Sequence, residues 1–364
     1  MIYITTVENK SAGYTQASMN YMMSLYRTEQ DFTVFPIKNV LNWKLMPFWT
    51  DPLTMWTGKS GTSRDIGIYH HLPDALLTLP KIHEKKSIGI TTFETSKLPR
   101  WITNAFNKSN FDMLLTPSDF NTEILRESLD IPVHTLPHSI GEWWWSDEDK
   151  RTDHSEDRPF TFLYAGAWNG RKNPQMVLDA YLDAFPTETG DTCLAIKTLK
   201  QESFVAKLAD KIGDRSDIFI YHEMFNEEQM KWFHKMADCY VSAHRGEGFG
   251  LGLLQSKLLG RPCIYTDWSA PNEFCNKDRD DIAIEYDMKA ISTFDQEHMH
   301  FQTDDDEVLY WAEPNYDHLV SSMRDAYKRG RSNYHQKEWL PELRSSYSWE
   351  NVGHKFKDYK SMLS

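Results

Sequence analysis

A carboxylate stands alone in a glycine-rich turn within HRGEGFGLGLLQSKLLGRPCIYT, residues 244–266. Glu247 lies between glycines, an apolar run typical of a helix start follows, and Gln255 comes eight positions later. Glycines let backbone amides approach a ligand, and a helix start presents its positive end to an anion. Glu247 would repel a phosphate but can accept hydrogen bonds from sugar hydroxyls, and Gln255 can do the same for a ribose. The pattern predicts a nucleotide-sugar site.

The spacing of these two residues adds a geometric expectation. Glu247 would project from the turn and Gln255 from the first turns of the helix. Because eight positions are just over two helical turns, we expect both side chains to lie near one face and to point into one cleft.

A second polar group occurs in AGAWNGRKNP, residues 165–174. Arg171 and Lys172 come just before Pro174, a residue favoured in the first turn of a helix. A guanidinium fork and an ammonium point charge suit a diphosphate. On composition alone, a solvated basic turn explains the two residues equally well.

The rest of the sequence predicts the elements that would hold these groups, because short β-branched runs alternate with longer helical patterns, as in parallel α/β sheets. The expected strands are 2–5, 32–35, 66–69, 87–92, 113–116, 133–136, 160–164, 192–197, 218–221, 239–242 and 263–266. The expected helices are 16–26, 118–128, 173–185, 201–212, 227–236, 252–259 and 316–328. The acidic run at 146–159 interrupts the alternation and is typical of a linker between two doubly wound domains. Such domains bind ligands at the carboxyl ends of their strands.

Length and composition narrow the class of protein. A chain of 364 residues suits two domains. The formal charge of −13 argues against a general nucleic-acid or anionic-membrane surface, and no apolar run approaches the roughly 20 residues of a membrane span. Cys193, Cys239, Cys263 and Cys275 lack CxxC spacing and are expected to be buried, reduced thiols. Because MIYITTVENK shows no signal peptide, we expect a soluble, cytoplasmic protein without an integral membrane segment.

From about residue 66 onward, the chain resembles the retaining GT-B glycosyltransferases of family 4, which include bacterial mannosyltransferases and glycogen-synthase-like enzymes. EGFGLGLLQ followed by GRPCIYTDWSAPNEF is similar to the family's E-x7-E helix and the strand and turn after it. FTFLYAGAWNGRKNPQMVLDAYLDAF is similar to the opening of its donor domain, ITTFETSKLPRW to part of its acceptor domain, and YSWENVGHKFKDY to its last helix. The resemblance implies a GT-B fold of two Rossmann-like doubly wound domains facing a central cleft.

The same resemblance assigns boundaries and roles. Residues 1–150 would form the acceptor-binding domain, 158–340 the nucleotide-sugar donor domain, and 347–364 a helix crossing back to the first domain. The enzyme would move a hexosyl or pentosyl group from a UDP- or GDP-sugar to an acceptor hydroxyl, with retention and without a metal or other cofactor. The implied catalytic residues are Glu247, Arg171, Lys172 and Glu94. The implied donor-binding residues are Gly13, Arg171, Lys172, Lys197, Gly248, Phe249, Gly250 and Gln255.

The chain departs from the family pattern at three positions. Gln255 stands where the family's second Glu usually binds the ribose, so that contact could persist without the charge. Ala167 replaces the first phosphate-binding Arg of many members and leaves more of the binding to Arg171 and Lys172. Glu94 stands where many members carry a His near the reacting centre.

Two alternatives to a glycan, lipid-linked glycan or small-glycoside acceptor stay open. The first is a bacteriophage-type enzyme that glycosylates hydroxymethylated bases in DNA, which needs an aromatic pocket and phosphate contacts. The aromatic segment 43–56 and a basic group could supply them, and the net charge weighs against it. The members of that group are Lys81, Lys85, Lys86, Lys97 and Arg100. The second alternative is an inactive nucleotide-sugar-binding protein.

Several acidic residues and two histidines could bind a metal or an acceptor, but each also has a simpler structural interpretation. Asp278 and Asp280 have the DxD spacing of a metal-binding motif, but a solvated turn is the preferred interpretation, as it is for residues 304–306. His70 and His71, at the end of an expected strand, could be structural or could contact the acceptor. The sequence leaves the sugar, the nucleotide and the oligomeric state open.

Overall fold

The computed structural model describes residues 1–5, 13–36, 65–79, 84–146, 158–198, 208, 210–292, 303–304, 306–331 and 337–363. The chain divides into two compact units. Unit 1 contains Met1–Glu142, Ile291–Tyr310 and Arg344–Ser364, and unit 2 contains Trp143–Ala290 and Trp311–Leu343. The aromatic segment 43–56, Lys81, most of the expected linker and most of the expected helix 201–212 lie outside the described residues.

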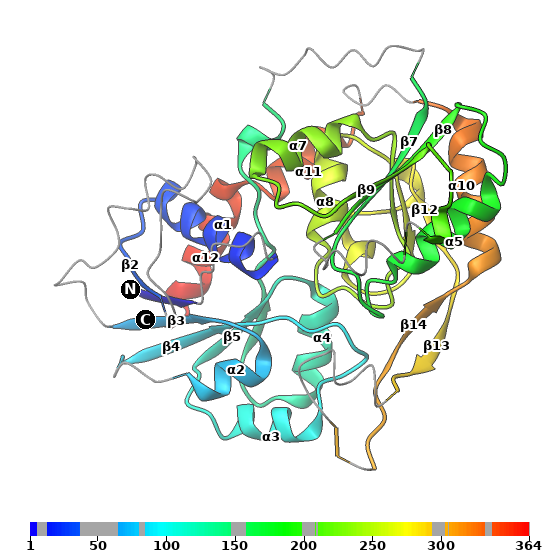
Figure 1. Ribbon diagram of the computed structural model, residues 1–364. Coiled ribbons are helices and arrows are strands. Elements are labelled where there is room, and N and C mark those ends of the chain that lie inside the picture. Colours follow the sequence, from blue (N-terminus) through cyan, green and yellow to red (C-terminus); the bar gives the residue numbers. More distant parts are fainter. Residues whose placement is uncertain are drawn as a thin grey trace. The chain divides into compact units, whose positions relative to one another are not determined.

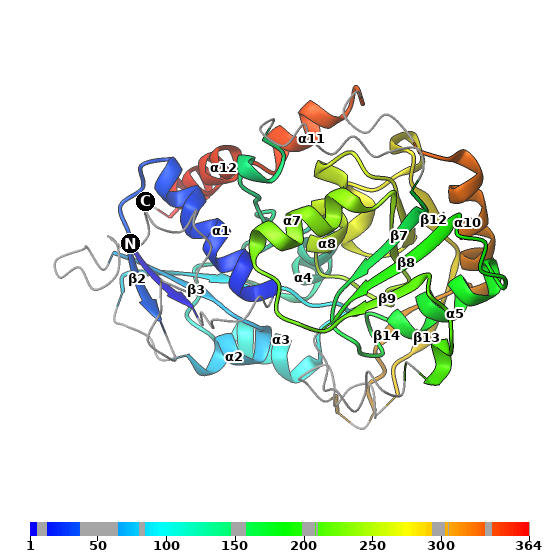
Figure 2. The same ribbon diagram turned by 45° about the horizontal axis from the view of Figure 1, so that its top comes forward.

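Unit 1 is built on a six-stranded parallel sheet in the order β2-β1-β3-β4-β5-β6. Its strands are β1 Ile2–Thr5, β2 Thr33–Pro36, β3 Ile66–His70, β4 Lys86–Ile90, β5 Met113–Thr116 and β6 Val133–Thr135. Its helices are α1 Gly13–Arg27, α2 Pro73–Thr78, α3 Arg100–Asn107, α4 Asp119–Ser128 and α12 Trp349–Ser361. Helices α1 and α12 cover one face of the sheet, and α2 and α3 cover the other (Figures 1 and 2).

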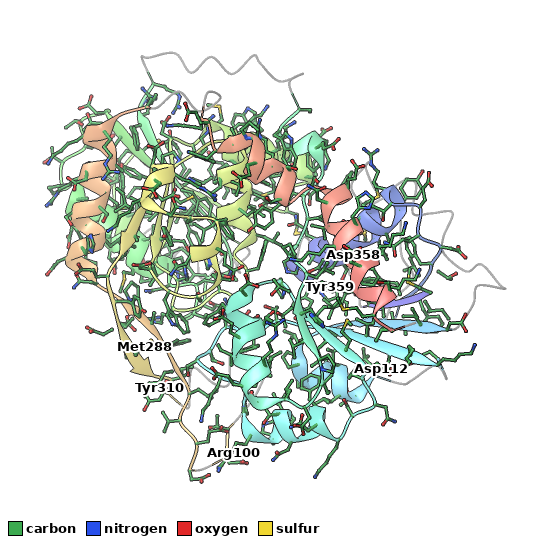
Figure 3. The ribbon with its side chains drawn as sticks, turned by 180° about the vertical axis from the view of Figure 1, so that it is seen from behind. Arg100, Asp112, Met288, Tyr310, Asp358 and Tyr359 are labelled. Atoms are coloured by element: carbon green, nitrogen blue, oxygen red, sulfur yellow. The ribbon has the colours of Figure 1, made fainter. Side chains whose placement is uncertain are left out.

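Helix α12 is held on unit 1 by hydrogen bonds and by a very close backbone approach. The Trp349 indole donates to the Asn20 side chain at 2.7 Å, and the Tyr359 hydroxyl donates to the Thr135 carbonyl at 2.9 Å (Figure 3). Gly353 lies against α1, where an added Cβ would come within 2.3 Å of the Ser24 carbonyl oxygen. Only glycine fits at this contact, which fixes where α12 crosses α1.

Unit 2 repeats the design with a parallel sheet in the order β12-β11-β10-β7-β8-β9. Its strands are β7 Phe160–Ala165, β8 Thr192–Lys197, β9 Ile218–Tyr221, β10 Cys239–Ser242, β11 Cys263–Thr266 and β12 Ile282–Ile284. Its helices are α5 Pro174–Ala184, α7 Glu227–Met236, α8 Leu251–Leu258 and α10 Tyr316–Arg329, with short 3-10 turns at Ala270–Glu273 and Lys277–Arg279. Helices α5 and α10 lie on one face, and α7 and α8 on the other (Figure 1).

The described chain also contains two more strands and one more helix. Strands β13 Tyr286–Ala290 and β14 Tyr310–Pro314 pair in a small two-stranded sheet, on which Met288 and Tyr310 are both exposed (Figure 3). Helix α11, Leu340–Ser346, precedes α12. The prediction of an α/β protein with two parallel sheets is confirmed by these two sheets.

The interiors of both units are apolar, as parallel sheets covered on both faces require. Strands β5, β8, β10 and β11 are buried along their whole length. All four cysteines are buried and none forms a disulfide, as predicted. No helix among the described residues is both long and apolar enough to cross a membrane.

Candidate active site

The turn that carries Glu247 follows β10 and leads into α8 in unit 2. Gly250 ends the turn in the left-handed conformation, with φ of 94°. A Cβ at this position would lie 3.2 Å from the Pro271 ring, so both the backbone and the space favour glycine. The Glu247 side chain is buried, with 6% of the residue exposed. A carboxylate held in this way needs charged partners.

Those partners come from the turn after β7, the strand next to β10 in the sheet. Arg171 Nη1 donates to the Gly246 carbonyl at 2.7 Å and lies 3.4 Å from Glu247 Oε2. Lys172 Nζ donates to Glu247 Oε1 at 2.5 Å. The structure therefore brings Arg171, Lys172 and Glu247 together from segments 75 and 76 residues apart.

The charges of Arg171 and Lys172 determine the protonation state of Glu247. Burial raises the pKa of Glu247, but Lys172 and Arg171 lower it more strongly, and His244 adds to the lowering, so that the pKa falls to about 2. The carboxylate is ionised at neutral pH. Two cations against one anion leave a single positive charge, so the group can still attract a ligand with negative charge.

Local backbone structure holds the basic turn in place. The Asn169 side chain accepts from the Lys172 backbone N–H at 2.9 Å, and Asn173 adopts the left-handed conformation with φ of 52° before Pro174 begins α5. The Arg245 guanidinium bonds Glu313 twice, at 2.7 and 2.6 Å, and donates to the Gly170 carbonyl. The Arg245 backbone N–H donates to the Arg171 carbonyl at 2.7 Å.

The Glu247 backbone is braced from the other side by Ser269. Glu247 N–H donates to Ser269 Oγ at 3.0 Å, and Ala270 N–H donates to the Glu247 carbonyl at 3.3 Å. Ser269 has φ of 70° and ψ of −165°, a backbone region that almost only glycine adopts. A non-glycine residue there stores strain beside the Glu247 carboxylate.

His244 is buried next to the same turn. Its Nδ1 is 3.0 Å from the Ser242 hydroxyl, and its Nε2 is 3.3 Å from the Trp268 carbonyl. Burial lowers the pKa of His244 to about 4, although Glu247 and the Trp268 carbonyl raise it in part. The ring is neutral at neutral pH and packs as a structural neighbour of Glu247.

The structure corrects the expected relation between Glu247 and Gln255. Helix α8 begins at Leu251, so Glu247 precedes it by four positions and helical periodicity does not connect the two residues. Gln255 lies in the second turn of α8 with 6% of the residue exposed. Its backbone carbonyl accepts from the Trp144 indole at 2.9 Å. Glu247 and Gln255 therefore do not share a helix face, and the prediction that they do is wrong.

The other residues expected to bind a donor lie at several places. Lys197 ends β8, where it is buried with its Nζ 5.1 Å from the centre of the Phe225 ring, and burial lowers its pKa. Gly248 follows Glu247 in the turn, and Phe249 is buried against Phe274, with ring centres 5.7 Å apart. Gly13 is the first residue of α1 in unit 1.

Glu94 follows β4 in unit 1, in a loop fixed by one amide. Asn121 Oδ1 accepts from the Thr92 hydroxyl at 2.8 Å and from the Phe93 N–H at 3.2 Å, while its Nδ2 donates to the Phe93 carbonyl at 2.9 Å. Ser118 caps α4 by accepting from the Asn121 N–H. The segment before Glu94 is thus held at the carboxyl end of the sheet.

The two neighbouring histidines have different environments. His70 is buried, and its Nδ1 lies 3.0 Å from the Tyr3 hydroxyl and 2.8 Å from the Ser18 hydroxyl. Burial lowers its pKa well below the usual value. His71 is half-buried and its Nδ1 accepts from the Leu72 N–H at 2.8 Å. The structural interpretation therefore fits His70 and leaves His71 nearer the surface.

The acidic motif that resembles a metal site lies in an ordinary turn. Asp278 is exposed in the 3-10 turn Lys277–Arg279, and Asp280 is ion-paired with Lys337. Within the described ranges, one group has metal-ligand spacing, formed by Cys263, Cys275 and Asp281. Asp281 is already paired with the buried Lys257 at 2.8 Å and accepts from the Cys263 N–H at 2.7 Å.

Sequence reasoning missed His244, Arg245, Ser269 and Asn169, although all four lie within the segments it quoted. The Asn-Gly-Arg-Lys-Asn turn signalled Asn169, because Asn favours turns that bind their own backbone. The strain at Ser269 and the Arg245–Glu313 pair depend on tertiary structure.

Residues 146–291 are similar to a known protein family, and the whole fold is similar to several solved structures. Residues 146–291 match the family described as "Glycosyl transferases group 1". No curated protein matches the chain significantly. Among solved structures, a glycosyltransferase from Rickettsia africae has a TM-score of 0.69 at 12% identity, with 100% of this chain and 98% of that chain covered.

Two further structures were determined with ligands. Anabaena HepE, in complex with UDP and glucose, has a TM-score of 0.63 at 9% identity, with coverage of 99% and 98%. The pneumococcal O-GlcNAc transferase GtfA, in complex with UDP and GlcNAc, has a TM-score of 0.57 at 14% identity, with 82% of this chain covered. This chain spans 56% of the pneumococcal protein's length. The fold is thus that of the GT-B glycosyltransferases, and the segment that supplies Arg171, Lys172 and Glu247 matches the glycosyl transferases group 1 family.

Proposed function

We propose that the protein is a glycosyltransferase that moves a sugar from a UDP- or GDP-sugar to an acceptor hydroxyl. The observation that carries the proposal is the convergence of Arg171, Lys172 and Glu247 at the carboxyl end of the unit 2 sheet. This group lies in the segment that matches the glycosyl transferases group 1 family. The ligands named for HepE and GtfA, UDP with glucose or GlcNAc, support a nucleotide-sugar donor.

In the proposed reaction, each charged group has a separate task. Arg171 offers a planar fork and Lys172 a point charge, and together they would bind the diphosphate and stabilise the charge that grows on it as it leaves. Glu247 would accept hydrogen bonds from hydroxyls of the transferred sugar. Its ion pairs with Arg171 and Lys172 support this division, because they hold the carboxylate next to the cations before a donor binds.

We further propose retention of the anomeric configuration without a metal. The resemblance to the retaining family supports a mechanism in which the leaving diphosphate helps to deprotonate the acceptor on the same face. The protein would then act by positioning and by electrostatic stabilisation. In unit 2, we propose that the amides near Gly248 and Gly250 contribute, with Lys197, Phe249 and Gln255 on the donor side. In unit 1, we propose roles for Glu94 and for the amides near Gly13.

A glycan or small-molecule acceptor is better supported than DNA. Four of the five basic residues proposed to contact DNA are described, and each faces a carboxylate within unit 1 (Figure 3 labels Arg100). The pairs are Lys85–Asp65, Lys86–Asp112, Lys97–Glu307 and Arg100–Asp306. Side chains already neutralised in this way contribute less to binding a polyanion.

The test is donor turnover by the purified chain. UDP- and GDP-sugars are incubated with the protein, with and without EDTA, and release of the nucleoside diphosphate is measured, with the product anomer assigned by NMR. We expect release with at least one donor, unaffected by EDTA, and loss of release in Arg171→Ala and Lys172→Ala. Lys211→Ala, which removes a cation of unit 2 paired with Asp179, is the matched control. Binding without turnover would indicate the inactive alternative, and a strict metal requirement would contradict the mechanism.

A further inference from the structure

Arg245 connects the turn that carries Glu247 with the turn that carries Lys172, but the proposed reaction gives it no task. Its backbone N–H donates to the Arg171 carbonyl at 2.7 Å, and its guanidinium Nη1 donates to the Gly170 carbonyl. Two successive carbonyls just before Lys172 are therefore held by this one residue. Because both bonds are to the backbone, they fix the path of the basic turn and not only the position of one side chain.

Arg245 is itself held by strand β14. Its Nε and Nη2 donate to the two carboxylate oxygens of Glu313 at 2.7 and 2.6 Å, and its carbonyl accepts from the Ala312 N–H at 2.9 Å. The guanidinium carbon lies 5.5 Å from the centre of the Trp311 ring. Two parallel N–H···O bonds fix the plane of a guanidinium, whereas an ammonium has no such plane. Strand β14 therefore sets the direction in which Arg245 reaches the Gly170 carbonyl.

The charges of Arg245 and Glu313 cancel each other. Burial raises the pKa of Glu313, but its bonds with Arg245 and Lys289 lower it more strongly, so the carboxylate is ionised at neutral pH. Lys289 Nζ lies 3.2 Å from Glu313 Oε2, but its side chain is largely exposed, so water screens its charge. The positive charge offered to a diphosphate therefore comes from Arg171 and Lys172, and what the Arg245–Glu313 pair can contribute is geometry.

We propose that Arg245 and Glu313 are positioning residues of the donor site. They hold the backbone of the basic turn beside the Glu247 turn so that Arg171 and Lys172 both reach the diphosphate of the donor, and neither of the two touches the donor itself. This inference rests on the proposed nucleotide-sugar donor. Positioning matters because a displacement of about 1 Å can cost a bound group most of its catalytic effect.

The first experiment uses the sign of the effect on nucleotide binding. Glu313→Gln removes a negative charge near the site, so a purely electrostatic role would make the binding of UDP or GDP tighter. A positioning role predicts the opposite, because a Gln side chain can accept at only one of the two positions that hold the Arg245 fork. We expect the dissociation constant of UDP or GDP, measured by isothermal titration calorimetry on the full chain, to rise about five- to twentyfold.

A second variant tests the same geometry with the charge kept. Arg245→Lys retains the positive charge, but an ammonium cannot reproduce the planar fork to Glu313 together with the bond to the Gly170 carbonyl. Binding should again weaken, about three- to tenfold, whereas a role of charge alone would leave it unchanged. The double variant Arg245→Lys/Glu313→Gln should bind no more weakly than the weaker single variant, because both changes break the same support. Fold-changes that multiply in the double variant would contradict a shared role.

The matched control is a second arginine–carboxylate fork in unit 2. Arg215 Nε and Nη2 donate to the two oxygens of Asp217 at 2.8 and 2.6 Å, just before β9 and thus at the amino end of the sheet. Asp217→Asn should lower the melting temperature at least as much as Glu313→Gln, because the Asp217 side chain is 6% exposed and that of Glu313 24%. It should leave nucleotide affinity unchanged. If Glu313→Gln behaves in the same way, the role of Glu313 is structural only and the inference is overturned.

The outcomes separate this inference from the proposed function. If nucleotide-sugars are turned over but Glu313→Gln binds the nucleotide as tightly as the wild type or more tightly, the positioning inference is overturned and the function stands. If the affinities change as expected but no nucleotide-sugar is turned over, the positioning role stands and the proposed function fails. If neither UDP nor GDP binds the wild-type chain, both fail, because Arg245 and Glu313 would then have no donor to position.

Discussion

The carboxyl ends of the two sheets treat their polar groups differently. In unit 2, Arg171 and Lys172 are bonded to Glu247 before any ligand arrives. In unit 1, the buried His70 ring at the end of β3 is held by the neutral hydroxyls of Tyr3 and Ser18. A buried charge needs charged partners, whereas a buried neutral ring is satisfied by hydroxyl groups. Ion pairs therefore organise the polar group in unit 2, and neutral hydrogen bonds organise the one in unit 1.

The strongest test of this contrast is Glu247→Ala. The variant removes the proposed contact to the sugar but keeps the cations Arg171 and Lys172, which would still bind a diphosphate. Transfer should lose roughly 2–4 kcal/mol of transition-state stabilisation, as for other preorganised charged contacts, while UDP affinity is kept or increased. Steady-state kinetics and UDP titration measure the two effects, with the exposed Glu228→Ala as control. A rate within a few-fold of the wild type in a folded variant would place the sugar site elsewhere.

Each unit contains a buried histidine that should make the free energy of unfolding depend on pH. Burial lowers the pKa of His138 in unit 1 to about 3 and that of His244 in unit 2 to about 4. The unfolded chain takes up these protons below about pH 6.5, and the folded chain does not, so the free energy of unfolding should fall as the pH drops from 6.5 towards 4. Glu247 contributes in a lower window, because its stabilisation is complete above about pH 4.5 and is lost towards pH 2.

Single substitutions measure how much the buried histidine of each unit contributes to this pH dependence. His138→Gln and His244→Gln should each reduce the loss between pH 6.5 and 4.5 by about 1–2 kcal/mol in urea unfolding, since one unit of pKa difference is worth about 1.4 kcal/mol. His354→Gln on the exposed side of α12 should leave the pH dependence unchanged. Equal slopes in all four proteins would show that the buried rings are protonated in the folded state.

Strain at Ser269 gives a smaller effect, confined to unit 2. Ser269→Gly should relieve a backbone cost of about 1–3 kcal/mol but lose the acceptor of the Glu247 N–H, so the protein should gain about 1 kcal/mol while transfer slows several-fold. Ser269→Ala keeps the strain and loses the bond, so it should be less stable than both. Thermal unfolding and transfer rates, measured together, check the order. A Gly variant that is less stable than the Ala variant would contradict the assignment of strain.

The sequence was sufficient for the fold class, because strand and helix periods alternate clearly in both halves of the chain. It missed β12, β13 and β14, since Ile282–Ile284 is only three residues long and Tyr286–Ala290 is mostly exposed and polar. It also missed the helices α2, α3 and α11, which have six, eight and seven residues. Short elements lack the length over which periodicity can be recognised.

At the candidate site, the sequence could indicate those residues that lie in a recognisable local sequence pattern. Arg171, Lys172 and Glu247 stand next to glycines or turn residues, so their segments were recognisable. Ser269 and Glu313 are single polar residues without such a signal, and only the tertiary structure brings Ser269 to the Glu247 backbone and Glu313 to Arg245. The expected shared face of Glu247 and Gln255 failed for a related reason, because a helical rule was applied across a helix boundary.

Gln255 offers the mildest test of the unit 2 site, and its corrected geometry sharpens it. The residue is buried in the second turn of α8 rather than in the turn that holds Glu247. If it bonds the ribose, as we propose, it contributes a neutral hydrogen bond, which is worth less than the charge-assisted contact of Glu247. Gln255→Ala should therefore raise KM for the donor with a total cost of about 1 kcal/mol or less and little change in kcat.

The companion variant Gln255→Glu introduces the carboxylate that the resemblance would lead one to expect at this position. A carboxylate can still accept hydrogen bonds from ribose hydroxyls, so transfer should be kept within a few-fold, whereas Gln255→Ala lacks any acceptor. The two variants together distinguish the loss of a hydrogen-bond acceptor at position 255 from a change of charge there. A donor KM that is unchanged in Gln255→Ala would place the ribose away from α8, and the proposed donor site would then rest on the Arg171, Lys172 and Glu247 group alone.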